Sequence, residues 1–165
     1  MSQDPNAPST PVVAPSDARF AIVWSRFNRS VVQALVDGAT TCLFDHGVDA
    51  DAVDSLQVPG AWELSHVALK LAKTGRYDAI ITLGAVIRGG TPHFDYVCDG
   101  VTRGLMRVML DTGVPIAFGV LTTDDEAQAN ARAGGDQGNK GRDAALTAIE
   151  MVVLDRKLRN DALAT

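Results

Sequence analysis

The chain has 165 residues, 46% of them hydrophobic, which is enough for one sizeable core but too short for a second domain of typical size. Its net charge of -5 and isoelectric point near 5.0 argue against a nucleic-acid surface, because binding to a phosphate backbone needs a basic face. No apolar run is long enough to span a membrane, so we expect one domain that binds neither nucleic acid nor membrane.

The first 17 residues differ in composition from the rest. They contain four of the seven prolines and have neither a basic cluster nor an apolar core of signal-peptide length. We therefore expect a disordered tail over residues 1–17 and a folded domain over residues 18–160. Cys42 and Cys98 form neither a metal-site spacing nor a disulfide framework, which favours buried thiols in a reducing cytosol and a cytoplasmic protein.

Strand-like and helix-like segments alternate through the first half of the domain. Residues 19–25 (RFAIVWS) predict a first strand, and a helix is expected over residues 30–47 with Ser30 as its N-cap. Residues 51–58 predict a weaker second strand. A Pro-Gly turn then leads into a helix expected over residues 61–74.

The second half continues the alternation. Residues 77–87 (YDAIITLGAVI) are almost continuously apolar, as expected for a central parallel strand buried on both faces. A helix over residues 94–112 and a fourth strand over residues 114–121 follow. Thr123 and Glu126 match a capping box at the start of the next helix. The remaining expected segments are a helix over residues 123–133, a loop over 134–140 and a helix over 141–158.

This order of elements predicts a three-layer α/β/α domain with a four-stranded parallel sheet. Ligands of such folds bind at the carboxyl ends of the strands. Residues suited to substrate binding follow each predicted strand, and together they suit a flat, polar, phosphate-bearing substrate set. They are Phe27, Asn28, Ala61, Trp62, Glu63, Val86, Ile87, Gly90, Thr91, His93, Phe118, Arg132 and Lys140.

The segment between residues 84 and 96 is the most informative of these. Its Gly89-Gly90-Thr91 sequence leaves backbone N–H groups uncovered just before a helix, which favours an anion such as phosphate. His93 adds an imidazole, which can take or give a proton near neutral pH.

Each candidate residue alone also fits a purely structural role. Phe27 and Trp62 can plug the ends of the core, and Glu63 can complement a helix dipole. His93 can fill a turn, and the two cations can be solvated surface charges. Only their shared place at one edge of the sheet favours the functional interpretation.

Several sharper motifs are absent. The glycine-rich residues 135–141 lack the Gly-Lys-Ser/Thr ending of a phosphate loop and follow a helix instead of a strand. No Gly-x-Gly-x-x-Gly follows the first strand, and no Gly-x-Ser-x-Gly elbow is present. His93, Asp95 and Cys98 form no recognised metal spacing, so we expect no metal.

Six segments are specific when taken together: Arg26-Phe27-Asn28, residues 58–64 (VPGAWEL), 83–97 (LGAVIRGGTPHFDYV), 118–123 (FGVLTT), 126–129 (EAQA) and 132–141. In unbroken order from about Arg19 to Leu158 they resemble the lumazine synthase family. The resemblance implies a flavodoxin-like fold and 6,7-dimethyl-8-ribityllumazine synthase activity in riboflavin biosynthesis. Such an enzyme joins 5-amino-6-(D-ribitylamino)uracil to L-3,4-dihydroxy-2-butanone 4-phosphate, releases phosphate and water, and uses neither cofactor nor metal.

The resemblance also implies roles for the candidate residues. Phe27 would stack on the pyrimidine, and its polar edge would be bound by Asn28 and by the backbone of Val86 and Ile87. The ribityl chain would be held by Ala61, Trp62 and Glu63. Gly90, Thr91 and Arg132 would bind phosphate, His93 would transfer protons, and a neighbouring subunit would supply Phe118, Arg132 and Lys140.

The family likeness implies a homo-oligomer. We expect a pentamer and not a 60-chain capsid, because the proline-rich tail is poorly suited to adding a strand to a neighbouring sheet. Two alternatives stay open at this point: a non-catalytic flavin- or lumazine-binding protein of the same fold, and a structural shell protein. The complete set of candidate residues favours the enzyme.

Overall fold

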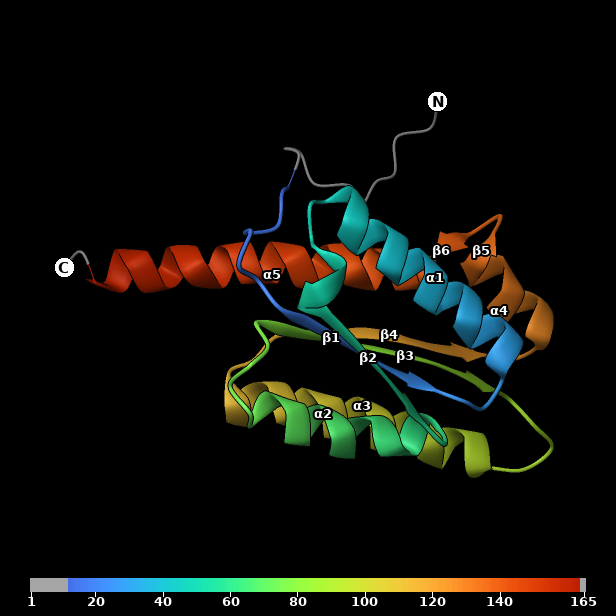
Figure 1. The fold of residues 1–165 in the computed structure, drawn as a ribbon. Helices are drawn as coiled ribbons and strands as arrows, with labels where there is room; N and C mark the ends of the chain where they lie inside the picture. Colours follow the sequence, from blue (N-terminus) through green and yellow to red (C-terminus); the bar gives the residue numbers. More distant parts are fainter. Residues whose placement is uncertain (1–11, 164–165) are drawn as a thin grey trace.

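The computed structural model describes residues 12–163, so most of the predicted tail lies outside the described residues. Four parallel strands form its sheet in the order β2-β1-β3-β4 (Figure 1). They are β1 (Phe20–Ser25), β2 (Val53–Val58), β3 (Ala79–Ile87) and β4 (Ile116–Thr123). The predicted three-layer α/β/α fold with a flavodoxin-like sheet is confirmed.

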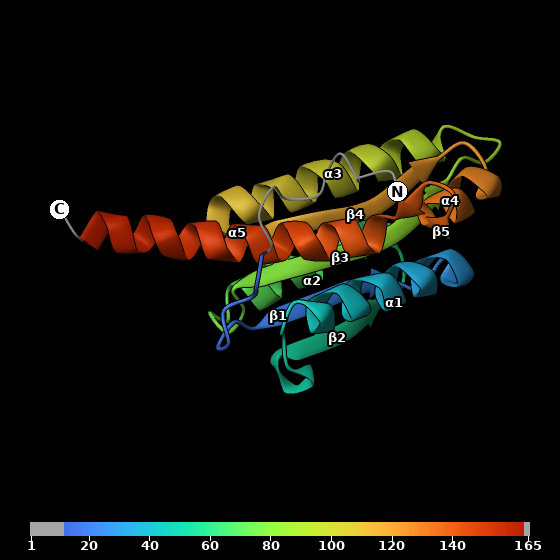
Figure 2. The ribbon, with the colours of Figure 1, turned by 90° about the horizontal axis from the view of Figure 1, so that it is seen from above.

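Helices cover both faces of the sheet, and the two sides carry separate apolar clusters. One face packs against α2 (Leu64–Ala72) and α3 (His93–Thr112), and the other against α1 (Arg29–Asp45) and α5 (Lys140–Leu163). Figure 2 shows α1 and α5 on one side of the sheet. Because both faces are covered, the first seven residues of β3 are fully buried, as its apolar sequence predicted.

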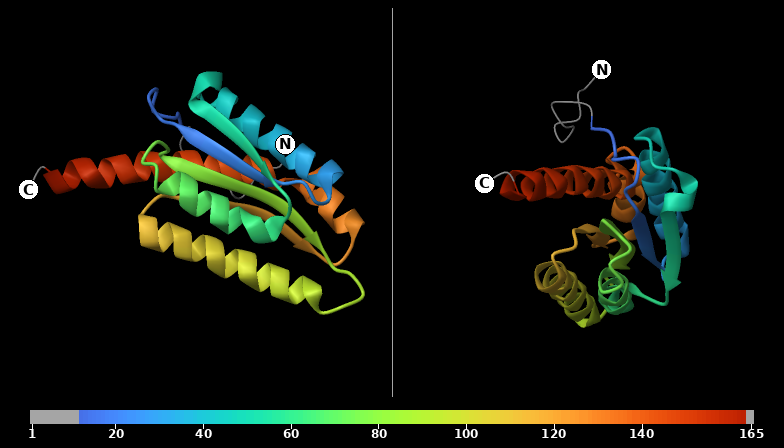
Figure 3. Two further views of the ribbon diagram at one scale, coloured as in Figure 1. Left: turned by 60° about the horizontal axis from the view of Figure 1, so that its bottom comes forward. Right: turned by 60° about the vertical axis from the view of Figure 1, so that its left-hand side comes forward.

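The remaining elements are short. Single turns of 3-10 helix, η1 (Ala50–Ala52) and η2 (Ala61–Glu63), flank β2, and α4 (Glu126–Arg132) follows β4. The predicted helix over residues 61–74 is therefore a 3-10 turn followed by α2. Figure 3 shows that α5 runs well past the end of the sheet, farther than the predicted end at residue 158.

Two predicted helix caps are wrong. Asn28, and not Ser30, is the N-cap residue of α1; it adopts a left-handed backbone with φ of 56°. Thr123 is the last residue of β4, and the carboxylate of Asp125 caps α4 by accepting a 2.7 Å hydrogen bond from the Gln128 N–H. Asparagine tolerates the left-handed backbone, and aspartate is a common side-chain cap.

The predicted loop over residues 134–140 is also wrong. Two short antiparallel strands, β5 (Ala133–Gly135) and β6 (Gly138–Asn139), occupy it, and α5 begins at Lys140. The Asn139 side chain donates to the Ala34 carbonyl at 2.9 Å and accepts from the Gly141 N–H at 2.9 Å. A Cβ at Gly141 would collide with the Leu35 carbonyl oxygen, so this glycine permits the close approach of α5 to α1.

The described part of the predicted tail, residues 12–17, contacts the domain. Ala14 is buried, and its N–H donates to the His46 carbonyl at 3.0 Å. Arg156 on α5 pairs with Asp17 at 2.5 Å and with Asp78 at 3.2 Å. The hydrogen bond from Arg156 is the largest cause lowering the pKa of Asp17. These contacts connect the start of the described chain to the end of α1 and to α5.

Candidate active site

The strand order reverses between β1 and β3, and the candidate site lies where these two strands end. β1 pairs with β3 only as far as Trp24 and Leu83, whereas β3 stays paired with β4 as far as Ile87. The last residues of β3 therefore extend beyond β1 and leave one side of their backbone without a strand partner. In open α/β sheets such a switch point is the usual place for a ligand.

A cavity of about 590 Å³ opens at this point. Its walls come from four segments: the chain after β1, the turn after β2, the end of β3 and the first turns of α3. They contribute Phe27, Pro59, Gly60, Ala61, Trp62, Glu63, Ala85, Val86, His93, Tyr96 and Val97. The structure thus brings together six of the predicted site residues: Phe27, Ala61, Trp62, Glu63, Val86 and His93.

Three aromatic rings around the cavity are unusually exposed. The exposed fractions are 69% for Phe27, 58% for Trp62 and 73% for Tyr96. A flat ligand that covers exposed rings in a concave site removes their apolar surface from water, and this burial stabilises the complex. Sequence reasoning missed Tyr96, although it lies three residues after His93 and therefore on the same face of the helix.

The polar groups of the cavity lie at the starts of two helices. Glu63 ends η2 directly before α2 and is half-buried, with its carboxylate over Gly60. His93 is the first residue of α3 and is exposed. Gly90 and Thr91 are also exposed, and they form the approach to the N-terminus of this 20-residue helix. An anion would be stabilised there by free N–H groups and the helix dipole.

The end of β3 offers backbone groups of its own. Residues of a strand alternate in the side to which their N–H and carbonyl point, and the Arg88 N–H bonds to the β4 carbonyl of Thr123. The N–H and carbonyl of Ile87 therefore face away from β4, beyond the end of β1, while Val86 contributes its side chain to the cavity. Asn28 does not line the cavity, because its amide nitrogen donates to the Ala85 carbonyl at 2.9 Å.

Three predicted site residues, Phe118, Arg132 and Lys140, do not line the cavity of His93 in the same chain. Phe118 lies within β4 and not at its end, and it lines a second cavity of about 440 Å³ together with Lys140. Lys140 pairs with Asp143 at 2.7 Å. Arg132 ends α4 and donates to the Gln128 carbonyl at 3.1 Å. That a neighbouring subunit supplies these three residues stays a prediction.

Charged groups shape the entrance of the site. The hydrogen bond with Asp124 is the largest cause raising the pKa of the Arg88 guanidinium, and Asp95 adds to it. Burial and, next, Asp95 raise the pKa of the Cys98 thiol, which makes this cysteine a poor nucleophile.

Within residues 12–163 no three acidic, histidine or cysteine side chains gather in a way that could hold a metal ion. Over the same residues, no helix is long and apolar enough to cross a membrane.

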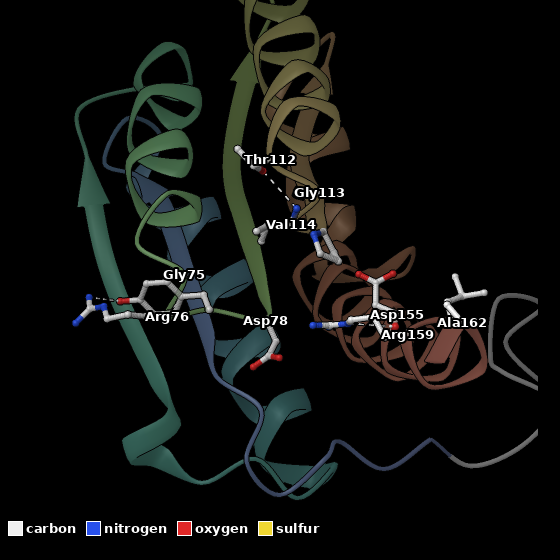
Figure 4. Close-up of a pocket in the computed structure, with 12 residues that line it drawn as sticks. Gly75, Arg76, Asp78, Thr112, Gly113, Val114, Asp155, Arg159 and Ala162 are labelled. Carbon is white, nitrogen blue, oxygen red and sulfur yellow. Dashed lines mark hydrogen bonds between the residues drawn. The ribbon is translucent and has the colours of Figure 1, made fainter. Parts of the chain in front are cut away.

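A cavity of similar size, about 600 Å³, lies at the opposite end of the sheet, where β3 and β4 begin (Figure 4). It is formed by the turns before β3 and β4 together with the end of α5, and it contains none of the predicted site residues. Its arginines have partners nearby. Arg76 donates to the Tyr77 hydroxyl at 2.8 Å, and Arg159 donates to the Asp155 carbonyl at 3.4 Å. This cavity therefore is not the candidate site.

A sequence model of the 6,7-dimethyl-8-ribityllumazine synthase family matches residues 17–156, which is most of the chain. The chain belongs to this family. It is therefore an enzyme, a transferase of riboflavin biosynthesis, as its resemblance predicted. The comparisons give no support to a non-catalytic binding protein.

Individual relatives agree with the family match. The chain is 58% identical over 142 residues to the 6,7-dimethyl-8-ribityllumazine synthase of Chlorobium luteolum, covering 86% of this chain and 92% of that protein. It is 57% identical over 140 residues to the synthase of the same name from Salinibacter ruber, covering 85% and 90%. The synthase of Pelodictyon phaeoclathratiforme is 54% identical over 147 residues, covering 89% and 95%.

A close contact between Trp62 and Gly100 predicts a large effect of a small substitution. The indole of Trp62 lies against α3 where Gly100 has no side chain, and a Cβ there would collide with the ring. Gly100→Ala should therefore displace this wall of the cavity. Because small misplacements of groups that position substrate slow catalysis, kcat/KM should fall by roughly tenfold. The measurement is steady-state synthase kinetics of the purified variant.

A second substitution separates this effect from a general loss of stability. Trp62→Phe removes the outer ring of the indole, so Gly100→Ala should cost much less in a Trp62→Phe background. Arg103→Ala, on the same helix, serves as the control. Equal losses from Gly100→Ala in both backgrounds would show that the contact with Trp62 does not matter.

Proposed function

We propose that the chain condenses 5-amino-6-(D-ribitylamino)uracil with L-3,4-dihydroxy-2-butanone 4-phosphate, and that 6,7-dimethyl-8-ribityllumazine forms in the cavity beyond β1 and β3. One observation carries this proposal: exposed aromatic rings, a carboxylate and an imidazole line a single cavity at the switch point of the sheet. The rings suit a flat heterocycle, and the polar groups suit its side chain and the reaction centre.

The pyrimidine would stack on Phe27, with its polar edge at the free backbone groups of Ile87. Asn28 supports this arrangement, because its bond to Ala85 connects the chain after β1 to β3. The ribityl chain would extend toward Ala61 and Trp62 and donate hydrogen bonds to the Glu63 carboxylate. These contacts orient the nucleophilic amine before the ketone arrives.

The phosphate of the second substrate would bind near Gly90 and Thr91, at the N-terminus of α3. His93, the first residue of that helix, would then move protons while the amine adds to the ketone, water leaves and phosphate is eliminated. Arg132 has the planar fork that binds a phosphate through paired hydrogen bonds and stabilises the charge of the leaving group. This assignment requires Arg132 to come from another subunit.

The family implies an oligomer, and we propose a pentamer with sites shared between neighbours. Phe118 and Lys140 border the second cavity on β4, which is an edge strand of the sheet. If this edge faced the aromatic cavity of the next subunit, repetition of the contact would close a ring. Exposed Met106 and Leu110 on α3 support a subunit contact. Both cysteines are free thiols, which supports the cytoplasm as location.

The assay of this function follows product fluorescence from the two purified substrates, with and without a metal chelator. We expect turnover that chelation leaves unchanged, because the proposed steps use only protein groups. Turnover that requires an added metal would contradict the metal-free mechanism. Tight product binding without turnover would contradict the proposed synthase activity and indicate a binding protein.

A further inference from the structure

Arg88, the residue directly after β3, contacts three side chains from two segments at the entrance of the site. Its Nε donates to the Asp124 carboxylate at 3.0 Å, and its Nη1 donates to Asp95 at 3.2 Å. The guanidinium lies 4.1 Å from the ring centre of Phe94. One side chain thus joins the β4–α4 connection to the first turn of α3, both of which lie at the same end of the sheet (Figure 1).

This arrangement is stronger than an isolated surface ion pair. An exposed pair contributes little, because two long side chains lose their freedom for one contact. Here a single planar guanidinium makes two charged hydrogen bonds along its edges and a cation–π contact through its face. Its own backbone is held as well, since the Arg88 N–H donates to the Thr123 carbonyl at 2.9 Å.

The contacts of Arg88 enclose the segment that carries the proposed chemistry. Residues 89–93 lie between Arg88 and its partners Phe94 and Asp95, and this interval includes Gly90, Thr91 and His93. The interval is exposed. Within this turn, the Asp95 N–H also donates to the Pro92 carbonyl at 3.0 Å.

We infer that Arg88 is a positioning residue, which holds residues 89–93 so that the imidazole of His93 and the phosphate-binding backbone keep one geometry. Its guanidinium contacts two carboxylates and one aromatic ring. Arg88 therefore acts through residues 89–93 and not by direct contact with substrate. The inference rests on the proposed function for its catalytic consequence. The effect on the segment itself is independent of that function.

The test compares Arg88→Gln with Arg103→Gln. Arg103 makes an ordinary ion pair within α3, to Asp99 at 2.6 Å, and is the matched control. Hydrogen–deuterium exchange of a peptide covering residues 88–96 should become roughly tenfold faster in Arg88→Gln, given the size of such contacts, and stay unchanged in Arg103→Gln. Peptides covering β1 and α1 should exchange as in the unmodified chain.

Kinetics give the second readout. Arg88→Gln should lower kcat by roughly ten- to a hundredfold, because small misplacements of reacting groups have effects of that size. The KM for the phosphate-bearing ketone should rise, while the KM for the pyrimidine stays the same, since Phe27 and Glu63 lie outside the enclosed segment. Asp124→Asn should reproduce part of the loss, and the double variant should lose no more than Arg88→Gln alone.

Two results would overturn the inference. Unchanged exchange of residues 88–96 in Arg88→Gln would show that the contacts do not order the segment. A raised ketone KM in Arg88→Gln, with normal kinetics in both Asp95→Asn and Asp124→Asn, would show that Arg88 binds substrate directly. If the unmodified chain lacked turnover, the proposed function would fail, and the exchange comparison would still decide the role of Arg88.

Discussion

Replacement of His93 by alanine should lower kcat roughly ten- to a thousandfold, at or somewhat below the typical contribution of a general acid–base group, because substrate alignment remains. Among the residues that the structure describes, His93 is the only histidine that lines the aromatic cavity. Several proton transfers accompany condensation, elimination and ring closure. Catalysis should not fall to zero, because alignment of the two substrates survives the substitution. The measurement is kcat for product formation with both substrates saturating.

His66→Ala is the matched control for this prediction. His66 is an exposed histidine on α2 that does not line the aromatic cavity. Its replacement should leave kcat unchanged, and circular dichroism should show the same fold for both variants. Unchanged turnover in His93→Ala would remove His93 from the mechanism, and equal losses in the two variants would indicate a nonspecific effect.

The second large effect concerns sites shared between chains. As pure proteins and at a ketone concentration near the KM of the unmodified chain, Arg132→Ala and His93→Ala should each have less than about a tenth of its activity, Arg132→Ala chiefly through weaker binding of the ketone. Oligomers assembled from equal amounts of the two should regain about a quarter of the unmodified activity, because in a randomly mixed ring that fraction of sites joins an intact His93 to an intact Arg132. Coexpression of the two chains with different tags, followed by purification through both, provides the sample.

Two controls accompany the mixing experiment. Pure variants combined after separate assembly should stay inactive unless their subunits exchange. Light scattering should give a mass of about five times 17.4 kDa for every sample, and a mass near sixty chains would contradict the pentamer. Coexpressed oligomers no more active than the parent variants, or an active monomer, would show that Arg132 does not act across a subunit boundary.

Local sequence signals predicted most of the fold. The apolar residues 77–87 identified the central strand, and strand β3 occupies residues 79–87. The Gly-Gly-Thr-Pro sequence placed His93 at a helix start, where α3 begins. These features were readable because strand burial, glycine turns and helix starts depend on residues close together in the chain.

The same signals failed where a distant partner decided the outcome. The sequence did not indicate that the amide nitrogen of Asn28 is hydrogen-bonded to Ala85, 57 residues away, and its predicted role in substrate binding stays a prediction. The hairpin of β5 and β6 was missed, because Asn139 attaches it to Ala34 on α1, 105 residues away. Neither contact leaves a periodic pattern in the sequence.

For the site, the sequence by itself determined which residue types follow each strand, and therefore the family and the proposed chemistry. Only the tertiary structure decided that six of these residues share one cavity, that Tyr96 joins them, and that Phe118 and Lys140 face a different one. It also revealed the contacts of Arg88 with Asp95 and Asp124. The physical reason is that strand order and helix packing bring together side chains whose spacing along the chain carries no record of their distance in space.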